Sequence, residues 1–497
     1  MEHKFAELKS RLSEIHDLRR AQELLFWDQT VFMPPGGGGV RGAQLETLDR
    51  IAHEKFVSDA IGALLEELRP LEESLDYDSD EASLIRVTRR DWDKARRVPA
   101  ELAAEMTRAA ADGHDVWAKA RQDSDFAMFL PALERNVELK RRYIECFAPY
   151  EDPYDPLLDD YEPGMKTAEV HAVFDDLKRE LIPLIAEVAN GADDDFMRGP
   201  FDAGAQHELS LELVRRFGFE DDHFRLDRTV HPFAASSARN DIRLTTRYKE
   251  DDLTSLFTAM HEGGHGLYEH GISETLERTP LCHGVSSALH ESQSRMWENV
   301  VGRSQPFWRW FYPRLQSAFP AALGGVELDR FYRAVNRVRP SYIRVDADEA
   351  TYNLHIILRF ELELEIVNDR IALRDLPEAW NARFKEYLGI DVPEDRLGIL
   401  QDVHWSGGGL GYFPTYSLGN IVSLQIWEKV RDALPDLEDD FERGEFGRLH
   451  EWLRENLYSL GRKYTPQETL ERIVGTGIDA GPYVRYLKDK LGALAAA

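Results

Sequence analysis

The sequence is poor in cysteine, in positive charge and in long apolar runs. Its 497 residues include only two cysteines, Cys146 and Cys282, too few for a disulfide framework and compatible with a cytoplasmic protein. Lys and Arg number 61 against 90 Asp and Glu, and the resulting net charge of −29 disfavours nucleic acid and anionic membranes as partners. No apolar stretch approaches the roughly 18 residues of a membrane span. Residues 1–20 are charged throughout and lack the apolar core of a signal peptide. We therefore expect a cytoplasmic protein that binds neither nucleic acid nor membrane.

The most informative motif is the run from His261 to His265, which has the pattern HExxH. Residues four apart on a helix lie one above the other, so His261 and His265 can reach one metal ion with Glu262 beside it. A random chain of this composition would contain the pattern roughly once in twenty trials. The apolar spacing on both sides predicts a helix over residues 253–270, where this geometry works.

Two glycines, Gly263 and Gly264, lie inside the motif. Each costs about 1 kcal/mol relative to Ala in a helix interior. We expect them where a substrate or a crossing helix comes close, and the alternative is simple tolerance of loose packing.

A catalytic zinc site usually has three protein ligands and one open position, so a third donor is needed. The extended pattern HExxHxxGxxH fails, because Tyr268 and Gly271 stand where it needs Gly and His. Glu269 lies roughly 6 Å beyond His265 along the helix axis, too far to share the ion. The third ligand should therefore come from another helix.

That second helix is predicted over residues 285–301 and is expected to pack antiparallel to the first. Glu291 is the favoured ligand on it. Glu298 is the runner-up, two turns further along the same face. His283 and His290 remain possible nitrogen ligands, although a polar helical setting favours a hydrogen-bonding role for them.

This constellation predicts a metallopeptidase. Zinc lowers the pKa of its bound water, and Glu262 can accept the proton and later deliver it to the leaving amine. General acid–base catalysis of this kind is worth about 10²–10⁴-fold.

An enzyme that removes C-terminal residues also needs a cation for the free carboxylate, for which the planar fork of Arg is suited. Two arginines lie in segments unlike surface helices, Arg243 in a predicted strand and Arg344 in an irregular stretch. The glycine-rich segment 398–416 could present hydrogen-bond donors to an oxyanion, or could be an ordinary connection with packed aromatics.

The chain resembles the carboxypeptidase Taq family of metallocarboxypeptidases over nearly its whole length. No departure occurs at the metal or base positions. The resemblance is carried by several short motifs in one order: Leu25–Gln29, Met33–Gly36, Leu157–Gly164, His231–Phe233, Asp241–Thr245, His261–His265, His290–Ser292, Ile343–Asp348 and Gly398–Trp405.

The resemblance implies that His261, His265 and Glu291 bind the metal and that Glu262 is the base. It implies zinc as the cofactor, with cobalt able to substitute, and a homodimer. It also implies removal of single C-terminal residues from short peptides, with broad specificity and C-terminal proline disfavoured. The related alternatives are an oligopeptidase or dipeptidyl carboxypeptidase of the same chemistry, or a non-catalytic protein of the same fold.

The substrate contacts implied by the resemblance lie on both sides of the motif. His231, Asp241 and Arg243 would close the end of the groove and limit substrate length. Arg344 would anchor the carboxylate of the substrate. His404, with Tyr412 or Tyr416, would contact the oxyanion and the substrate.

No low-complexity linker divides the chain, and we expect one mainly α-helical domain over residues 1–497. The resemblance implies a large saddle-like peptidase fold with a deep groove and a small β-sheet near the active site, which the alternation in residues 224–248 supports. Residues 1–110 are expected to form a helical lid or dimer region and residues 224–410 the catalytic core.

Overall fold

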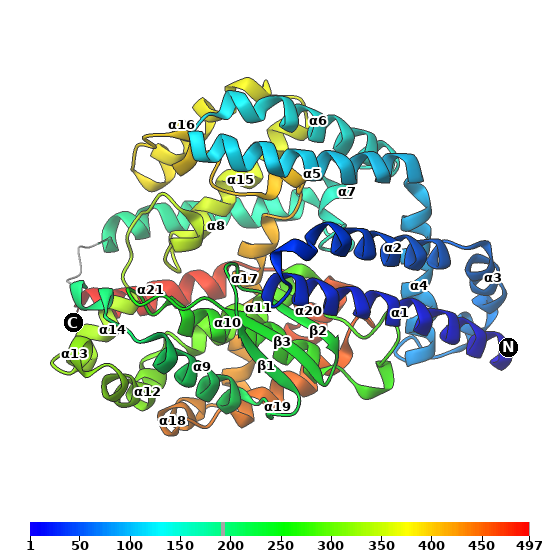
Figure 1. The fold of residues 1–497 in the computed structure, drawn as a ribbon. Coiled ribbons are helices and arrows are strands. Elements are labelled where there is room, and N and C mark those ends of the chain that lie inside the picture. The colour runs from blue at the N-terminus through cyan, green and yellow to red at the C-terminus, as the bar shows by residue number, and fades with distance from the viewer. Residues whose placement is uncertain (190–193, 497) are drawn as a thin grey trace.

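The computed structural model describes residues 1–189 and 194–496, and helices make up most of them (Figure 1). The predicted mainly helical fold with one small sheet is confirmed. No helix in the described ranges is long and apolar enough to cross a membrane. The helices that precede the sheet are α1 (Glu2–Val31), α2 (Gly38–Phe56), α3 (Asp59–Ser74), α4 (Asp80–Arg97), α5 (Ala100–Asp123), α6 (Phe126–Glu145), α7 (Asp155–Leu158), α8 (Thr167–Val188) and α9 (Ala203–Phe217).

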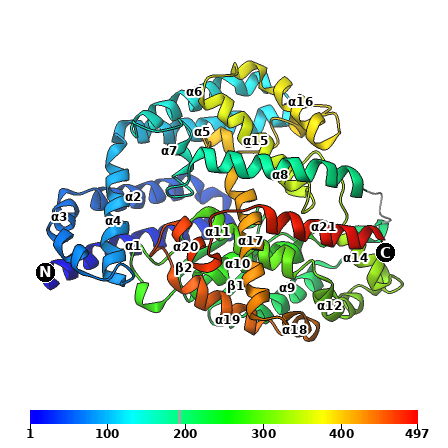
Figure 2. The same ribbon diagram turned by 180° about the vertical axis from the view of Figure 1, so that it is seen from behind.

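The helices after the sheet complete one large apolar core that runs from α5 to α21. In Figures 1 and 2, α5, α6, α15 and α16 lie above α10, α11 and α17, while α12, α18 and α19 lie below them. The elements are α10 (Thr254–Gly271), α11 (Ser287–Arg295), the π-helical turn η4 (Met296–Val301), α12 (Gln305–Ala318), α13 (Pro320–Leu323), α14 (Leu328–Val335), α15 (Tyr352–Val367), α16 (Leu376–Leu388), α17 (Pro414–Ala433), α18 (Leu437–Arg443), α19 (Gly447–Asn456), α20 (Pro466–Val474) and α21 (Gly481–Ala496).

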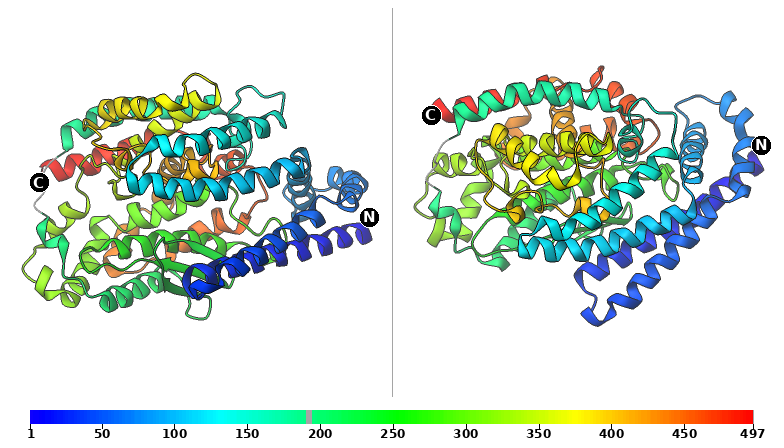
Figure 3. Two further views of the ribbon diagram at one scale, coloured as in Figure 1. Left: turned by 45° about the horizontal axis from the view of Figure 1, so that its top comes forward. Right: turned by 90° about the horizontal axis from the view of Figure 1, so that it is seen from above.

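Helices α1 to α4 have a smaller apolar core of their own. Figure 3 shows α1 and α2 as a long hairpin along one side of the molecule, with its turn projecting outward. This core also contains Ile272, Leu276 and Cys282 from the chain between α10 and α11, so the N-terminal helices are anchored beside the predicted site. Cys282 is buried there. The boundaries of the lid or dimer region and of the catalytic core stay predictions.

The sheet has three strands, β1 (Phe224–Arg228), β2 (Ala234–Ala238) and β3 (Asp241–Thr246), in the order β1-β3-β2. Strand β1 is parallel to the central β3 and β2 is antiparallel to it. A Cβ on Gly266 of α10 would come within 2.8 Å of Ile242 and 2.9 Å of Leu244. The missing side chain therefore lets α10 pack directly on β3.

Candidate active site

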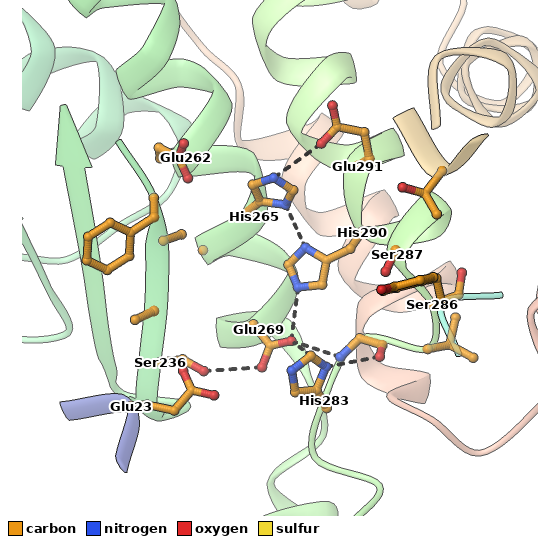
Figure 4. A pocket seen from close by; sticks show the side chains of 18 of the residues that line it. Glu23, Ser236, Glu262, His265, Glu269, His283, Ser286, Ser287, His290 and Glu291 are labelled. Atoms are coloured by element: carbon orange, nitrogen blue, oxygen red, sulfur yellow. Dashed lines mark hydrogen bonds and ion pairs between the residues drawn. The ribbon is translucent and has the colours of Figure 1, made fainter. Parts of the chain in front are cut away.

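Helices α10 and α11 bring the predicted metal ligands together, as the sequence pattern requires. His261 Nε2 lies 3.7 Å and His265 Nε2 lies 3.4 Å from the same oxygen, Glu291 Oε2. One ligand atom from each of these three residues lies within 4.8 Å of the other two. Figure 4 shows Glu291 on one helix facing His265 on the other.

The donor set fits a divalent ion such as zinc. It offers two imidazole nitrogens and one carboxylate oxygen, the composition of a catalytic zinc site with one open position. Two donors at about 2 Å from a shared tetrahedral ion are about 3.3 Å apart. The distances of 3.4 and 3.7 Å between the nitrogens and Glu291 Oε2 are close to this value.

Gly264 explains how the two helices approach so closely. A Cβ at this position would lie 2.5 Å from the Gln293 carbonyl oxygen and 2.7 Å from Ser294 Cα, both on α11. The expectation of a crossing helix is therefore confirmed for Gly264. At Gly263 the nearest atom would be Val214 Cγ2 at 3.9 Å, an ordinary contact, so this glycine is not needed for packing.

Glu298, the runner-up ligand, has a different position from Glu291. It contacts the far side of His261, with Oε2 at 2.9 Å from Nδ1, and it is not in the three-residue cluster. The predicted continuous helix 285–301 becomes a π-helical turn at residue 296, a distortion often found at functional sites. Arg295 donates to both carboxylates, at 2.7 Å to Glu291 and 3.1 Å to Glu298.

Burial and neighbouring charges set the protonation of these groups. Burial raises the pKa of Glu291, but Arg295 and the two histidines outweigh it and hold the pKa below its ordinary value. Burial lowers the pKa of His265 to about 4, so its imidazole is neutral and able to bind a metal. For Glu262, burial raises the pKa to about 7, which places this carboxyl near the pKa suited to proton transfer at neutral pH.

The cluster opens into a pocket of about 700 Å³. Glu262 lines it together with all three candidate ligands, so the proposed base and ligands share one space. The walls come from elements far apart in sequence. They include Arg20 and Glu23 of α1, Asp160, Tyr161 and Pro163, Pro232 to Ser236 of the β2 region, His283 to Ser287, His290 and Glu291, Tyr412, Thr415 and Tyr416, and Arg462.

In the glycine-rich segment 398–416, two tyrosines lie at the pocket and His404 lies behind them. Tyr412 and Tyr416 line the pocket. His404 stacks on Tyr412 and its Nε2 lies 3.3 Å from the Tyr416 hydroxyl. The segment is held by the buried Glu363, which accepts from Trp405 Nε1 at 2.7 Å and from the Gly411 amide at 2.9 Å.

Arg344 lies behind this wall and is not among the pocket-lining residues. Its Nε and Nη2 donate to Asp402 at 3.0 and 2.7 Å, and its Nη1 donates to Tyr352 at 2.9 Å. The guanidinium also packs 4.9 Å from the ring centre of Tyr416. The predicted role as a carboxylate anchor stays a prediction, and this arrangement shows a guanidinium already engaged by a carboxylate.

Arg243 and Asp241 pair with each other at the start of β3, and Arg243 packs 4.3 Å from the ring centre of Trp27 on α1. Neither residue lines the pocket. His231 is exposed and directly precedes the lining residue Pro232. Thr245 Oγ1 accepts from the Phe233 amide at 2.7 Å, which holds the lining segment in place. The closed-end role of these residues stays a prediction.

Sequence analysis missed two arginines that line the pocket, Arg20 and Arg462. Arg20 donates to the Ser236 and Cys282 carbonyl oxygens, both at 2.7 Å, and lies 3.5 Å from Glu269. No local pattern marks either residue, because each reaches the pocket only through long-range packing.

Comparison with known proteins identifies the family. The carboxypeptidase Taq (M32) metallopeptidase model matches residues 7–491. The chain is 40% identical to thermostable carboxypeptidase 1 of Thermus thermophilus, with 95% of each chain covered. It is 36% identical to carboxypeptidase 1 of Bacillus subtilis, covering 99% of this chain and 98% of the relative.

Solved structures agree with the sequence comparison. The M32 carboxypeptidase from Deinococcus radiodurans R1 superposes with a TM-score of 0.96 at 39% identity, with both chains covered completely. The carboxypeptidase of Pyrococcus furiosus gives a TM-score of 0.95 at 34% identity, covering 98% of this chain and 99% of the other. With a family model matching nearly the whole chain, this protein belongs to the carboxypeptidase Taq (M32) metallopeptidases and is a metallocarboxypeptidase.

Proposed function

We propose that this enzyme removes single C-terminal residues from short peptides, with broad specificity and with C-terminal proline disfavoured. Membership of a metallopeptidase family implies a divalent metal. The proposed metal is zinc, with cobalt able to substitute, and the proposed ligands are His261, His265 and Glu291. The observation that carries the proposal is the convergence of these three donors within 4.8 Å, in the pocket that Glu262 lines.

The proposed chemistry assigns the proton transfers to Glu262. A bound zinc ion would act as a Lewis acid and would acidify a water molecule. The Glu262 carboxylate accepts a proton from the attacking water and returns it to the leaving amine. Its burial and raised pKa support both transfers, because a carboxyl with a pKa of about 7 gives up a proton more readily than an amine and accepts one more readily than an ordinary carboxyl.

The remaining assignments rest on the resemblance and on placement. Tyr412 and Tyr416 are proposed to contact the oxyanion and the substrate, with His404 behind them. His231, Asp241 and Arg243 are proposed to limit substrate length. A homodimer and a cytoplasmic location are also proposed, the first from the resemblance and the second from the low cysteine content.

The test of this function is product size. A five-residue peptide with a blocked N-terminus is incubated with the metal-loaded enzyme, and its products are followed by mass. Successive loss of single residues from the free C-terminus is expected. Release of dipeptides or internal cleavage would favour the dipeptidyl carboxypeptidase or oligopeptidase alternative, and an inert metal-loaded protein would favour a non-catalytic one.

The carboxylate anchor is tested by substitution of Arg344, with Arg243 as the matched control. We expect Arg344→Ala to weaken binding of a free-acid peptide by about 10–100-fold, since a hydrogen bond to a charged group is worth about 1.5–3 kcal/mol. Binding of the C-terminally amidated peptide should change little. Both are measured by calorimetry in the Glu262→Gln background, which prevents turnover.

Equal loss for the two peptides would mean that Arg344 acts only by holding Asp402 and Tyr416. Loss confined to Arg243→Ala would move the anchor to β3.

A further inference from the structure

Behind the proposed metal site, a chain of hydrogen bonds leads away from His265. His265 Nδ1 lies 2.6 Å from His290 Nδ1, and His290 Nε2 lies 3.1 Å from Glu269 Oε1. Figure 4 shows this line from Glu291 through His265 and His290 to Glu269. The three linked side chains come from both helices, since His265 and Glu269 lie on α10 and His290 on α11.

Glu269, the last acceptor in this chain of hydrogen bonds, is held in place by several donors. Its side chain is buried, with 7% of the residue exposed. Oε1 also accepts from the Gly284 amide at 2.8 Å, and Oε2 accepts from Ser236 Oγ at 3.2 Å and faces Arg20 at 3.5 Å. These donors hold the carboxylate in one orientation and compensate its charge.

The number of protons on each imidazole determines which group donates and which accepts in these hydrogen bonds. A neutral imidazole carries one proton, so a His265 that offers Nε2 to a metal carries its proton on Nδ1. That proton points at His290 Nδ1, which must accept it. His290 then carries its own proton on Nε2 and donates it to Glu269 Oε1, so every group in the line is satisfied.

We propose that His290 and Glu269 are positioning residues that fix the tautomer and orientation of His265 as a metal ligand. The inference rests on the ligand set of the proposed function. His261 has a direct carboxylate partner in Glu298, whereas His265 reaches its carboxylate through a second histidine. Outer partners of this kind typically contribute about 10–100-fold to metal affinity.

The same residues also form a second cluster with metal-binding composition, Glu269, His283 and His290, whose ligand atoms lie within 4.8 Å of one another. The proton count makes the two uses of His290 exclusive. If His290 Nε2 bound an ion, Nδ1 would carry the proton and His265 Nδ1 would have to accept it. His265 Nε2 would then be protonated and unable to bind a metal. The protein should therefore bind one ion per chain.

The test measures zinc affinity of the metal-free protein by competition with a chromophoric chelator. We expect one ion per wild-type chain, and dissociation constants about 10–100-fold higher in Glu269→Gln and His290→Ala. His290→Asn should recover part of the loss, because its side-chain oxygen can replace Nδ1 as the acceptor for His265. The matched control His283→Gln removes a member of the second cluster and should change the affinity less than about twofold.

The absorption spectrum of the cobalt-loaded protein supplies a second readout, because it reports the coordination geometry directly. It should change in Glu269→Gln and not in His283→Gln. Wild-type affinity and spectrum in both Glu269→Gln and His290→Ala, or two ions per wild-type chain with one lost in His283→Gln, would overturn the inference. A wild-type protein that binds no ion, or a His265→Ala variant that binds as tightly as wild type, would instead overturn the proposed function.

Discussion

Replacing Glu262 by Gln should lower kcat by about 10²–10⁴-fold while leaving the bound metal in place. Gln keeps the shape of the side chain but cannot accept a proton from water or deliver one to the leaving amine. The residue lines the pocket beside the cluster and does not belong to it, so the metal should be retained. Steady-state kinetics on a short peptide, together with metal content by elemental analysis, checks both parts.

Two outcomes would contradict this role for Glu262. Activity within about tenfold of wild type would mean that another group moves the proton. Loss of the metal along with the activity would place Glu262 among the ligands.

Replacing Glu291 by Gln should weaken zinc binding by about 10³-fold, whereas Glu298→Gln should weaken it by only about 10–100-fold. The two glutamates form a matched pair, since both are largely buried and both accept from Arg295. They differ in what they face. Glu291 lies opposite both Nε2 atoms, and Glu298 lies on the outer Nδ1 of His261. Dissociation constants from chelator competition separate the two roles.

If Glu298→Gln lost the metal and Glu291→Gln retained it, the runner-up would be the ligand. Thermal unfolding of the metal-free variants provides the control for folding. Both substitutions remove one negative charge beside Arg295, so their unfolding temperatures should shift in the same direction.

The central part of the site could be predicted from the sequence because it depends on local spacing. HExxH fixes two donors and a base on one helix, and apolar periodicity locates that helix at residues 253–270, close to the observed Thr254–Gly271. The need for a third donor then points to the next polar helix. The juxtaposition of Glu291 with His261 and His265 follows from these steps.

The rest of the pocket depends on contacts between distant segments, which spacing does not report. Arg20 and Arg462 reach the pocket from opposite ends of the chain. The resemblance predicts Arg344 as the carboxylate anchor, yet Asp402 engages its guanidinium from 58 residues away. The hydrogen bond between His290 and Glu269 could not be predicted either, because the sequence pattern locates ligands on α10 and on α11 separately and does not report contacts between the two helices.

The location of the metal is the most direct test of the proposed site. Crystals of the zinc-loaded enzyme, measured at the zinc absorption edge, should show one anomalous peak per chain. This peak is expected about 2.0–2.2 Å from His261 Nε2, His265 Nε2 and a carboxylate oxygen of Glu291. A peak among Glu269, His283 and His290, or no peak in this pocket, would contradict it.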